Sequence, residues 1–378
     1  MELFAIGQGL PGPTSTQLVV SVATSRAGML GGLLALFMWN LPGLIVCTVA
    51  SVAAKEFIDP EDPPFWLVGF APAAIALLFQ AAYGFCGKLD NTLGKPMALV
   101  SCVVAVIVAG DENIDKSECQ WVYPVLLVCG SFFTYLDSKR SSPIGSYAKP
   151  QVGWDATSDE TMSRIGIPIA LGVIFFVVWL LILAGCVYIR RTEGLESGPF
   201  ALFECMYRVG SIIFGGGQVV LPMLYTEVVD TGWITDSTFY QGFALAQSLP
   251  GPLFNFAPFV GGSYLGVPGA LIAYLGLFSP GVVLIFAIMP FWATLRHVAW
   301  FKAALVGLNN TAMGFIFAAC ILMWESAIGN AAAAATFMVT GVFALKKTGG
   351  KFSAPLSIIV GGAVGAALHL AGLGQKPY

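Results

Sequence analysis

The sequence is dominated by apolar stretches that match the thickness of a lipid bilayer. A hydrocarbon core about 30 Å thick needs roughly 20 apolar residues for each helical crossing. Nine stretches reach all or most of that length, near residues 28–52, 65–86, 96–110, 120–136, 166–189, 267–291, 304–324, 331–345 and 354–372. Only 10% of the 378 residues are charged, whereas soluble domains contain about 25%. We therefore predict an all-α, multi-pass membrane protein whose first partner is the lipid bilayer, with the plasma membrane as its expected location.

Three further apolar segments, near 8–24, 198–224 and 240–262, are interrupted by proline and glycine. Proline removes a backbone donor and prevents a continuous helix, so the neighbouring backbone must line a cavity or pack inside the protein. A polar stretch near 137–164 divides the chain. It predicts a first repeat over 1–136, a linker over 137–165 and a second repeat over 166–378.

Several function classes are not expected from the composition. A net charge of −3 offers no basic surface for nucleic acid. His297 and His369 have no acidic companions, which argues against a metal site, and neither lies near a broken segment as a catalytic base would. We therefore expect that the protein is not an enzyme and that it binds no cofactor. The sequence is compatible with a homo-oligomer.

An internal repeat is the most informative feature of the chain. Gln8-Gly-Leu-Pro-Gly-Pro13 returns as Gln247-Ser-Leu-Pro-Gly-Pro252, with five identities in six positions at an offset of 239. Further pairs at an offset of 238 are Gly31 with Gly269, Pro42-Gly43 with Pro280-Gly281, and Val68-Gly69 with Val306-Gly307.

Loop charges indicate that the repeats have opposite orientations. The loop at 53–64 sums to −3, whereas its equivalent at 292–303 sums to +2. Likewise 110–119 sums to −3, against +3 for the three lysines at 346–351. Because cytoplasmic loops are enriched in Lys and Arg, corresponding loops are predicted on opposite sides of the membrane. Such inverted repeats are typical of secondary transporters.

The first repeat lacks a counterpart of the segment that precedes Gln247. About fifty residues precede that glutamine in its half, whereas seven precede Gln8. By symmetry about forty residues are missing. We expect either an incomplete N-terminus or a partner chain that completes the first half.

The interrupted segments are the candidate substrate site. Helix ends at such breaks expose unpaired N–H groups and a partial positive charge, which suits an anion, although a plain proline kink is the alternative. The glycines of Phe214-Gly-Gly-Gly-Gln218 permit close backbone approach to a ligand, or else tight helix crossing. The predicted positions at the three breaks are Gln8, Pro11, Gly12, Pro13, Gly215, Gly216, Gly217, Gln218, Gln247, Pro250, Gly251 and Pro252.

Uncharged polar residues accompany these breaks, namely Thr14, Ser15, Gln17 and Asn255. Hydroxyls and amides suit a tetrahedral oxyanion whose charge is countered by helix ends and one cation. Arg26 is the obvious cation, or it snorkels at a helix end. Glu204 and Arg208, four residues apart, form a structural ion pair, a proton-coupling site or part of an interface, and we favour the structural interpretation.

The motifs resemble one known family. Gln8-Gly-Leu-Pro-Gly-Pro-Thr-Ser-Thr-Gln17, followed by Ser25-Arg26-Ala27-Gly28, is similar to the first-half signature of the chromate ion transporter family. Phe214-Gly-Gly-Gly-Gln-Val-Val-Leu-Pro222 and Ala244-Leu-Ala-Gln-Ser-Leu-Pro-Gly-Pro252 are similar to its second-half signature. The family's upstream Phe-Gly-Gly-Pro element would lie before Met1.

The resemblance implies a two-half carrier that moves chromate, and related oxyanions such as sulfate, by alternating access. No Walker A sequence is present, so the expected energy source is the membrane potential or a coupled ion. A partner-dependent or non-transporting homologue and an anion channel are the alternatives.

Overall fold

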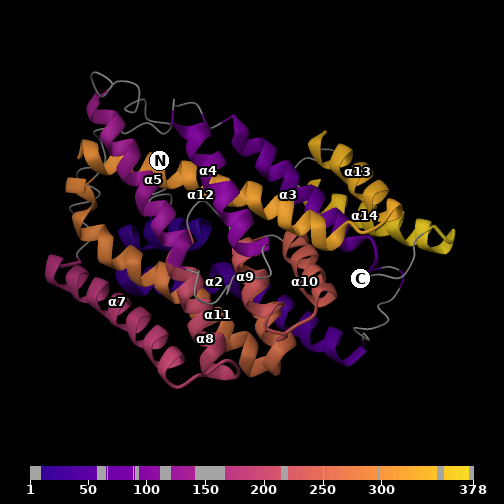
Figure 1. The fold of residues 1–378 in the computed structure, drawn as a ribbon. Coiled ribbons are helices and arrows are strands. Elements are labelled where there is room, and N and C mark those ends of the chain that lie inside the picture. The colour runs from indigo at the N-terminus through magenta and orange to yellow at the C-terminus, as the bar shows by residue number, and fades with distance from the viewer. Residues whose placement is uncertain are drawn as a thin grey trace.

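The computed structural model describes residues 10–57, 65, 67–87, 89, 93–110, 121–140, 167–213, 220–249, 251–295, 298–346 and 353–373. Every regular element within these ranges is a helix, as predicted (Figure 1). The elements before the polar linker are α2 (Thr14–Phe57), α3 (Phe70–Cys86), α4 (Gly94–Gly110) and α5 (Val122–Arg140). After it come α7 (Ile169–Thr192), α8 (Pro199–Ile212), α9 (Val220–Val228), α10 (Asp236–Ser248), the 3-10 turn η4 (Leu253–Asn255), α11 (Phe256–Leu295), α12 (Ala299–Ala327), α13 (Ala331–Leu345) and α14 (Ser353–Leu370).

The helices have the lengths that a membrane protein requires. Five of those described are long and apolar enough to cross a bilayer: 14–57, 169–192, 253–292, 300–325 and 353–370. Three shorter apolar helices, α3, α4 and α13, accompany them. α7 is the most apolar of the five, yet most of its side chains are exposed. An apolar, exposed helix of this length fits a position against lipid.

The longest helices, α2 and α11, are each broken at one point. Ala27 and Gly28 leave helical geometry in α2, and Leu265 and Gly266 do so in α11, with φ of 68° at Gly28 and 69° at Gly266. Positive φ is strained for residues with a Cβ, so glycine fits both positions. The two breaks lie 238 residues apart, which is the offset of the sequence repeat.

Helices of each half pack against helices of the other half. α3 contacts α13 and α14, while α12 contacts α4 and α5 (Figure 1). Glycines make both crossings close: a side chain on Gly69 would overlap the backbone of Gly361, and one on Gly307 that of Gly130. Small residues let helix backbones approach in this way in membranes.

The buried core lies beside the second Pro-Gly-Pro motif. Phe239 of α10 packs edge-on against Phe256 at the start of α11, with ring centroids 4.9 Å apart, and both rings are fully buried. This contact holds the end of α10 next to the beginning of α11. Of the predicted linker, α5 continues to Arg140, and residues 141–165 lie outside the described part of the chain.

Candidate functional site

The first Pro-Gly-Pro motif is a non-helical segment that leads into α2 and contacts the second half. The Gly12 N–H donates to the carbonyl oxygen of Ile213, at 2.8 Å. The Gln17 Nε2 donates to the Pro11 carbonyl at 2.7 Å and to the Gly281 carbonyl at 3.3 Å. Ile213 directly precedes the glycine-rich segment of the sequence. The first motif is therefore held between the end of α8 and the middle of α11.

The second motif has a corresponding arrangement. Pro252 precedes η4 with an extended backbone, and Gly251 has a φ of 131°, close to the 121° of Gly12. Asn255 is only 2% exposed and packs against Gly43 of α2. Any side chain on Gly43 would overlap the Asn255 amide. The first motif, and Asn255 three residues after the second motif, thus lie against the Pro-Gly pair of the opposite half.

Both motifs are followed by the N-terminus of a helix. The first bond of α2 runs from the Gln17 N–H to the Pro13 carbonyl, so the N–H groups of Thr14, Ser15 and Thr16 precede the intrahelical series. Those of Leu253 and Phe254 have the equivalent place at the start of η4. These amides and the helix dipole favour an anion.

The buried amides beside the motifs each retain one unused acceptor. Gln17 is 1% exposed, and its Oε1 has no hydrogen-bond donor among the described residues; the same holds for Asn255 Oδ1. The Gln17 amide nitrogen is committed to two backbone carbonyls. Its oxygen is therefore the part of the amide that is open to a water molecule or a protonated ligand.

Sequence comparisons identify the family of the chain. The family model described as Chromate transporter matches residues 1–134 and 200–366. The chain belongs to the chromate transporter family. The match covers both motif regions from which the resemblance was inferred.

Individual relatives agree with this membership. The chromate transport protein of Pseudomonas aeruginosa is 25% identical over 280 residues, which are 74% of this chain and 60% of that protein. The probable chromate transport protein of Synechococcus elongatus is 26% identical over 96% of this chain and 84% of its own length. The chromate transport protein of Cupriavidus metallidurans is 24% identical over 96% of this chain and 81% of its own length. No solved structure matches the chain.

The other residues that the sequence predicted for the site differ in how far they are buried. Thr14 is half-buried and Ser15 exposed at the start of α2, and Arg26 is exposed directly before the break in that helix. Gln247 is half-buried near the end of α10. Gln8, Gly215, Gly216, Gly217, Gln218 and Pro250 lie outside the described residues.

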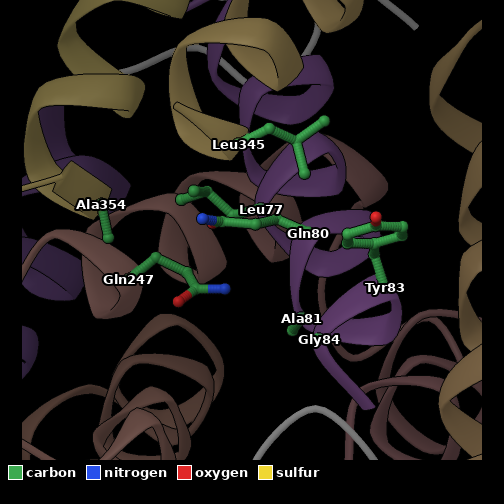
Figure 2. Close-up of a pocket in the computed structure, with 8 residues that line it drawn as sticks. All are labelled: Leu77, Gln80, Ala81, Tyr83, Gly84, Gln247, Leu345 and Ala354. Atoms are coloured by element: carbon green, nitrogen blue, oxygen red, sulfur yellow. The ribbon is translucent and has the colours of Figure 1, made fainter. Parts of the chain in front are cut away.

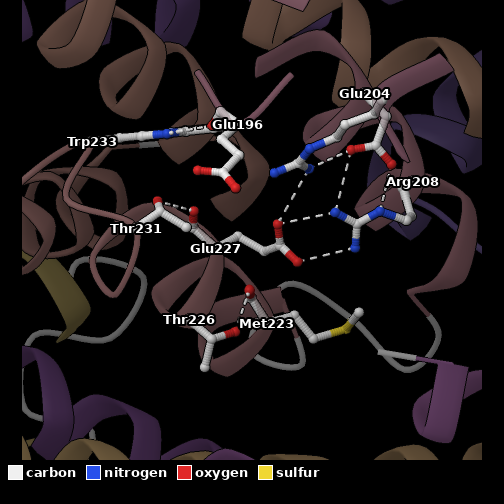
Figure 3. A network of polar contacts seen from close by, with 9 residues as sticks. Glu196, Glu204, Arg208, Met223, Thr226, Glu227, Thr231 and Trp233 are labelled. Carbon is white, nitrogen blue, oxygen red and sulfur yellow. Dashed lines mark hydrogen bonds and ion pairs between the residues drawn. The ribbon is translucent and has the colours of Figure 1, made fainter. Parts of the chain in front are cut away.

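The predicted pair of Glu204 and Arg208 is part of a larger charged cluster (Figure 3). Arg208 binds Glu204 Oε1 through Nε at 2.6 Å and both oxygens of Glu227 at 3.1 and 3.0 Å. The Arg190 Nη1 is 2.5 Å from Glu204 Oε2 and 3.6 Å from Glu227 Oε2. The cluster is neutral and joins α7, α8 and α9, on both sides of the glycine-rich segment.

A cavity of about 430 Å³ lies between α3, α10, α13 and α14 (Figure 2). Gln247 lines it, as does Gln80 of α3, whose Nε2 donates to the Ala344 carbonyl at 2.7 Å. Gln80, Glu227 and Asn40 are not among the site residues predicted from the sequence. A single polar residue inside an apolar span is the signal by which Gln80 and Asn40 stand out. Among the described residues, no cluster of potential metal ligands is found.

Proposed function

We propose that the chain carries chromate across the plasma membrane as a secondary transporter, with sulfate as a second substrate. The observation that carries the proposal is the pair of Pro-Gly-Pro motifs, each followed by a helix N-terminus, with the first motif and the Asn255 that follows the second each packed on the Pro-Gly pair of the opposite half. Family membership supports chromate as the substrate. Sulfate has the same tetrahedral shape and double negative charge, so the same donors suit it.

The substrate is held by backbone amides rather than by a fixed opposing charge. The N–H groups at the starts of α2 and η4 supply donors from opposite halves, and the two helix dipoles counter the substrate's charge. Uncharged donors hold an anion firmly enough to select it and weakly enough to release it. Transport rather than catalysis is the activity that such a site suits.

Alternating access is proposed to come from the two repeats, 1–136 and 166–378, in inverted orientation. The matched breaks at Gly28 and Gly266 support this proposal, because each half then has a long helix that is interrupted at the equivalent glycine. Opposite loop charges at equivalent positions support the inversion. Rocking of one half against the other would then expose the motifs to each side in turn.

The test is flux of radiolabelled chromate into vesicles that contain the purified full-length chain. Saturable uptake that unlabelled sulfate inhibits, and that substrate on the far side accelerates, is expected for a carrier. A channel would show no such acceleration. Flux equal to that of empty vesicles would overturn the transport proposal.

A matched pair of variants tests the amide donors. Leu253 is the first residue of η4, and Pro252 before it is already extended, which a following proline requires. Leu253→Pro removes one backbone N–H at a position where helices tolerate proline. We expect its KM for chromate to rise about tenfold or more over that of Leu253→Ala, since a hydrogen bond to a charged group contributes about 1.5–3 kcal/mol. Equal KM values would exclude this amide from the site.

A further inference from the structure

The cavity beside Gln247 has a defined place along the helices. It runs along α3 from Leu77, near the middle of the helix, to Gly84, near its end (Figure 2). Leu345, the last residue of α13, and Ala354, near the start of α14, also line it. The cavity therefore extends from the end of the helix bundle toward its interior.

One end of the cavity, at Leu345, lies next to a lysine. α13 ends next to the exposed Lys346, and Lys347 and Lys351 follow in the sequence before α14. Lys88 follows α3. Such an excess of lysine marks a cytoplasmic end. Lysines at a mouth also raise the local concentration of anions.

The inner end lies next to the second Pro-Gly-Pro motif. Gln247 is three residues before Pro250 and extends its amide into the cavity, opposite Gln80 (Figure 2). The Gln80 Nε2 uses one hydrogen on the Ala344 carbonyl, which fixes the amide and leaves its second N–H for another acceptor. The remaining lining is apolar apart from Tyr83, so the two amides and the Tyr83 hydroxyl are the polar side-chain groups in this space.

We propose that this cavity is the cytoplasmic vestibule through which a tetrahedral oxyanion reaches the second motif, with Gln80 and Gln247 as its first donors. The inference rests on the proposed function and assigns Gln80 a role in substrate access. Attraction by Lys346 beside the cavity, two neutral amides inside it and the helix-end amides after the second motif favour the anion along this path. Neutral donors also let it move on, since tight binding at an entrance would slow transport.

The experiment compares chromate kinetics in inside-out and right-side-out vesicles. Gln80→Glu replaces a donor with a negative charge, so the KM measured from the cytoplasmic side should rise about fivefold or more, while the KM from the other side stays within about twofold. Gly84→Trp should lower the cytoplasmic-side rate in the same one-sided way, because Gly84 lines the cavity, a Cβ there meets no atom within 4 Å, and a bulky ring would take up part of the space. Gln241→Glu is the matched control: it lies on α10 outside the cavity and donates to Ser237 Oγ at 3.0 Å.

The outcomes separate this inference from the proposed function. Saturable wild-type flux with both cavity variants unchanged, or altered equally from both sides, would overturn the vestibule and leave chromate transport intact. If the wild-type chain carries no chromate, binding of labelled chromate to the purified protein decides. Binding that Gln80→Glu weakens and Gln241→Glu does not would retain the vestibule, and no binding would overturn both proposals.

Discussion

In the first half the Thr16 hydroxyl donates to Asn40 Oδ1 at 3.3 Å, so this contact joins the two parts of the broken helix α2. In the second half the two positions at an offset of 238 are Phe254 and Phe278, whose ring centroids lie 6.5 Å apart. The same contact, between the start of a broken helix and the middle of its second part, is thus polar in one half and aromatic in the other. All four residues are buried.

This difference separates what the architecture requires from what function adds. Two phenyl rings satisfy the packing of such a contact without leaving any polar group to be paired. A buried hydroxyl and amide contribute less net stability, because the free-energy cost of removing them from water offsets most of the gain from their hydrogen bond. The aromatic pair therefore follows from packing alone, whereas the polar pair predicts a part in the proposed transport that paired replacement can test.

The largest effect is expected at the charged cluster, which joins α7, α8 and α9 in the second half. Arg208→Met leaves Glu204 and Glu227 buried with too little positive charge. Removing one partner of a buried ion pair costs about 3–5 kcal/mol, so the folded yield and the thermal stability in detergent should fall sharply. Arg191→Met, which changes an exposed neighbour of Arg190, is the control. Equal melting temperatures for the two variants would show that the cluster does not stabilise this half.

The next effect tests how alike the two reciprocal contacts are. Gly43→Ala should destabilise by about 1–3 kcal/mol, because the new methyl group overlaps the Asn255 side chain. Adding Asn255→Ala should restore most of the melting temperature, because it removes the two closest overlaps and leaves only the Cβ at 3.0 Å. Gly281→Ala approaches the Pro13 ring and the Gly12 backbone as well as the Gln17 amide, so adding Gln17→Ala should not restore it. Gly84→Ala, in open space, is the control. Rescue of both double variants would mean that the two contacts are interchangeable.

Much of this comparison could be predicted from the sequence. Apolar length predicted the helices, and the offset of 238 paired Pro42-Gly43 with Pro280-Gly281. The helix breaks at Gly28 and Gly266 were not predicted, although they lie at the same offset. The partners could not be predicted, because an offset says which residues correspond and not which ones touch. Arg190 and Glu227 join Glu204 and Arg208 only through the packing of α7, α8 and α9. Gln80 likewise becomes part of a cavity only once α3 lies beside α10.

A moderate effect is expected at the polar pair of α2, where stability and transport should respond differently. Thr16→Val with Asn40→Leu removes both members of the polar pair, and such paired replacement leaves stability within about 1 kcal/mol. If the pair serves the substrate, chromate flux falls about tenfold while the melting temperature holds. Phe254→Leu with Phe278→Leu at the equivalent positions should give the reverse: a lower melting temperature and a specific flux per folded protein that is nearly unchanged. Full flux in the first double variant would contradict a functional role for the polar pair.

The smallest effect is expected at Arg26, whose counterpart at the offset of 238 is Tyr264. Tyr264 is fixed: its ring stacks on Trp233 at 5.0 Å and its hydroxyl accepts from the Gly198 N–H at 2.9 Å. Arg26 is exposed at the end of a helical segment, where a cation also complements the helix dipole. It can therefore attract an anion from a distance without binding it.

Attraction of this kind depends on ionic strength. Exposed charges act over about 8 Å at physiological salt and about 3 Å at 1 M, so Arg26→Gln should lower the initial rate of chromate uptake about twofold at low salt and hardly at all at high salt. Tyr264→Phe, which keeps the stacked ring and removes only the hydroxyl, should show no such dependence. A loss in Arg26→Gln that persists at high salt would mean that the guanidinium contacts the substrate directly, and the first break would then bind the anion through a charge that the second break lacks.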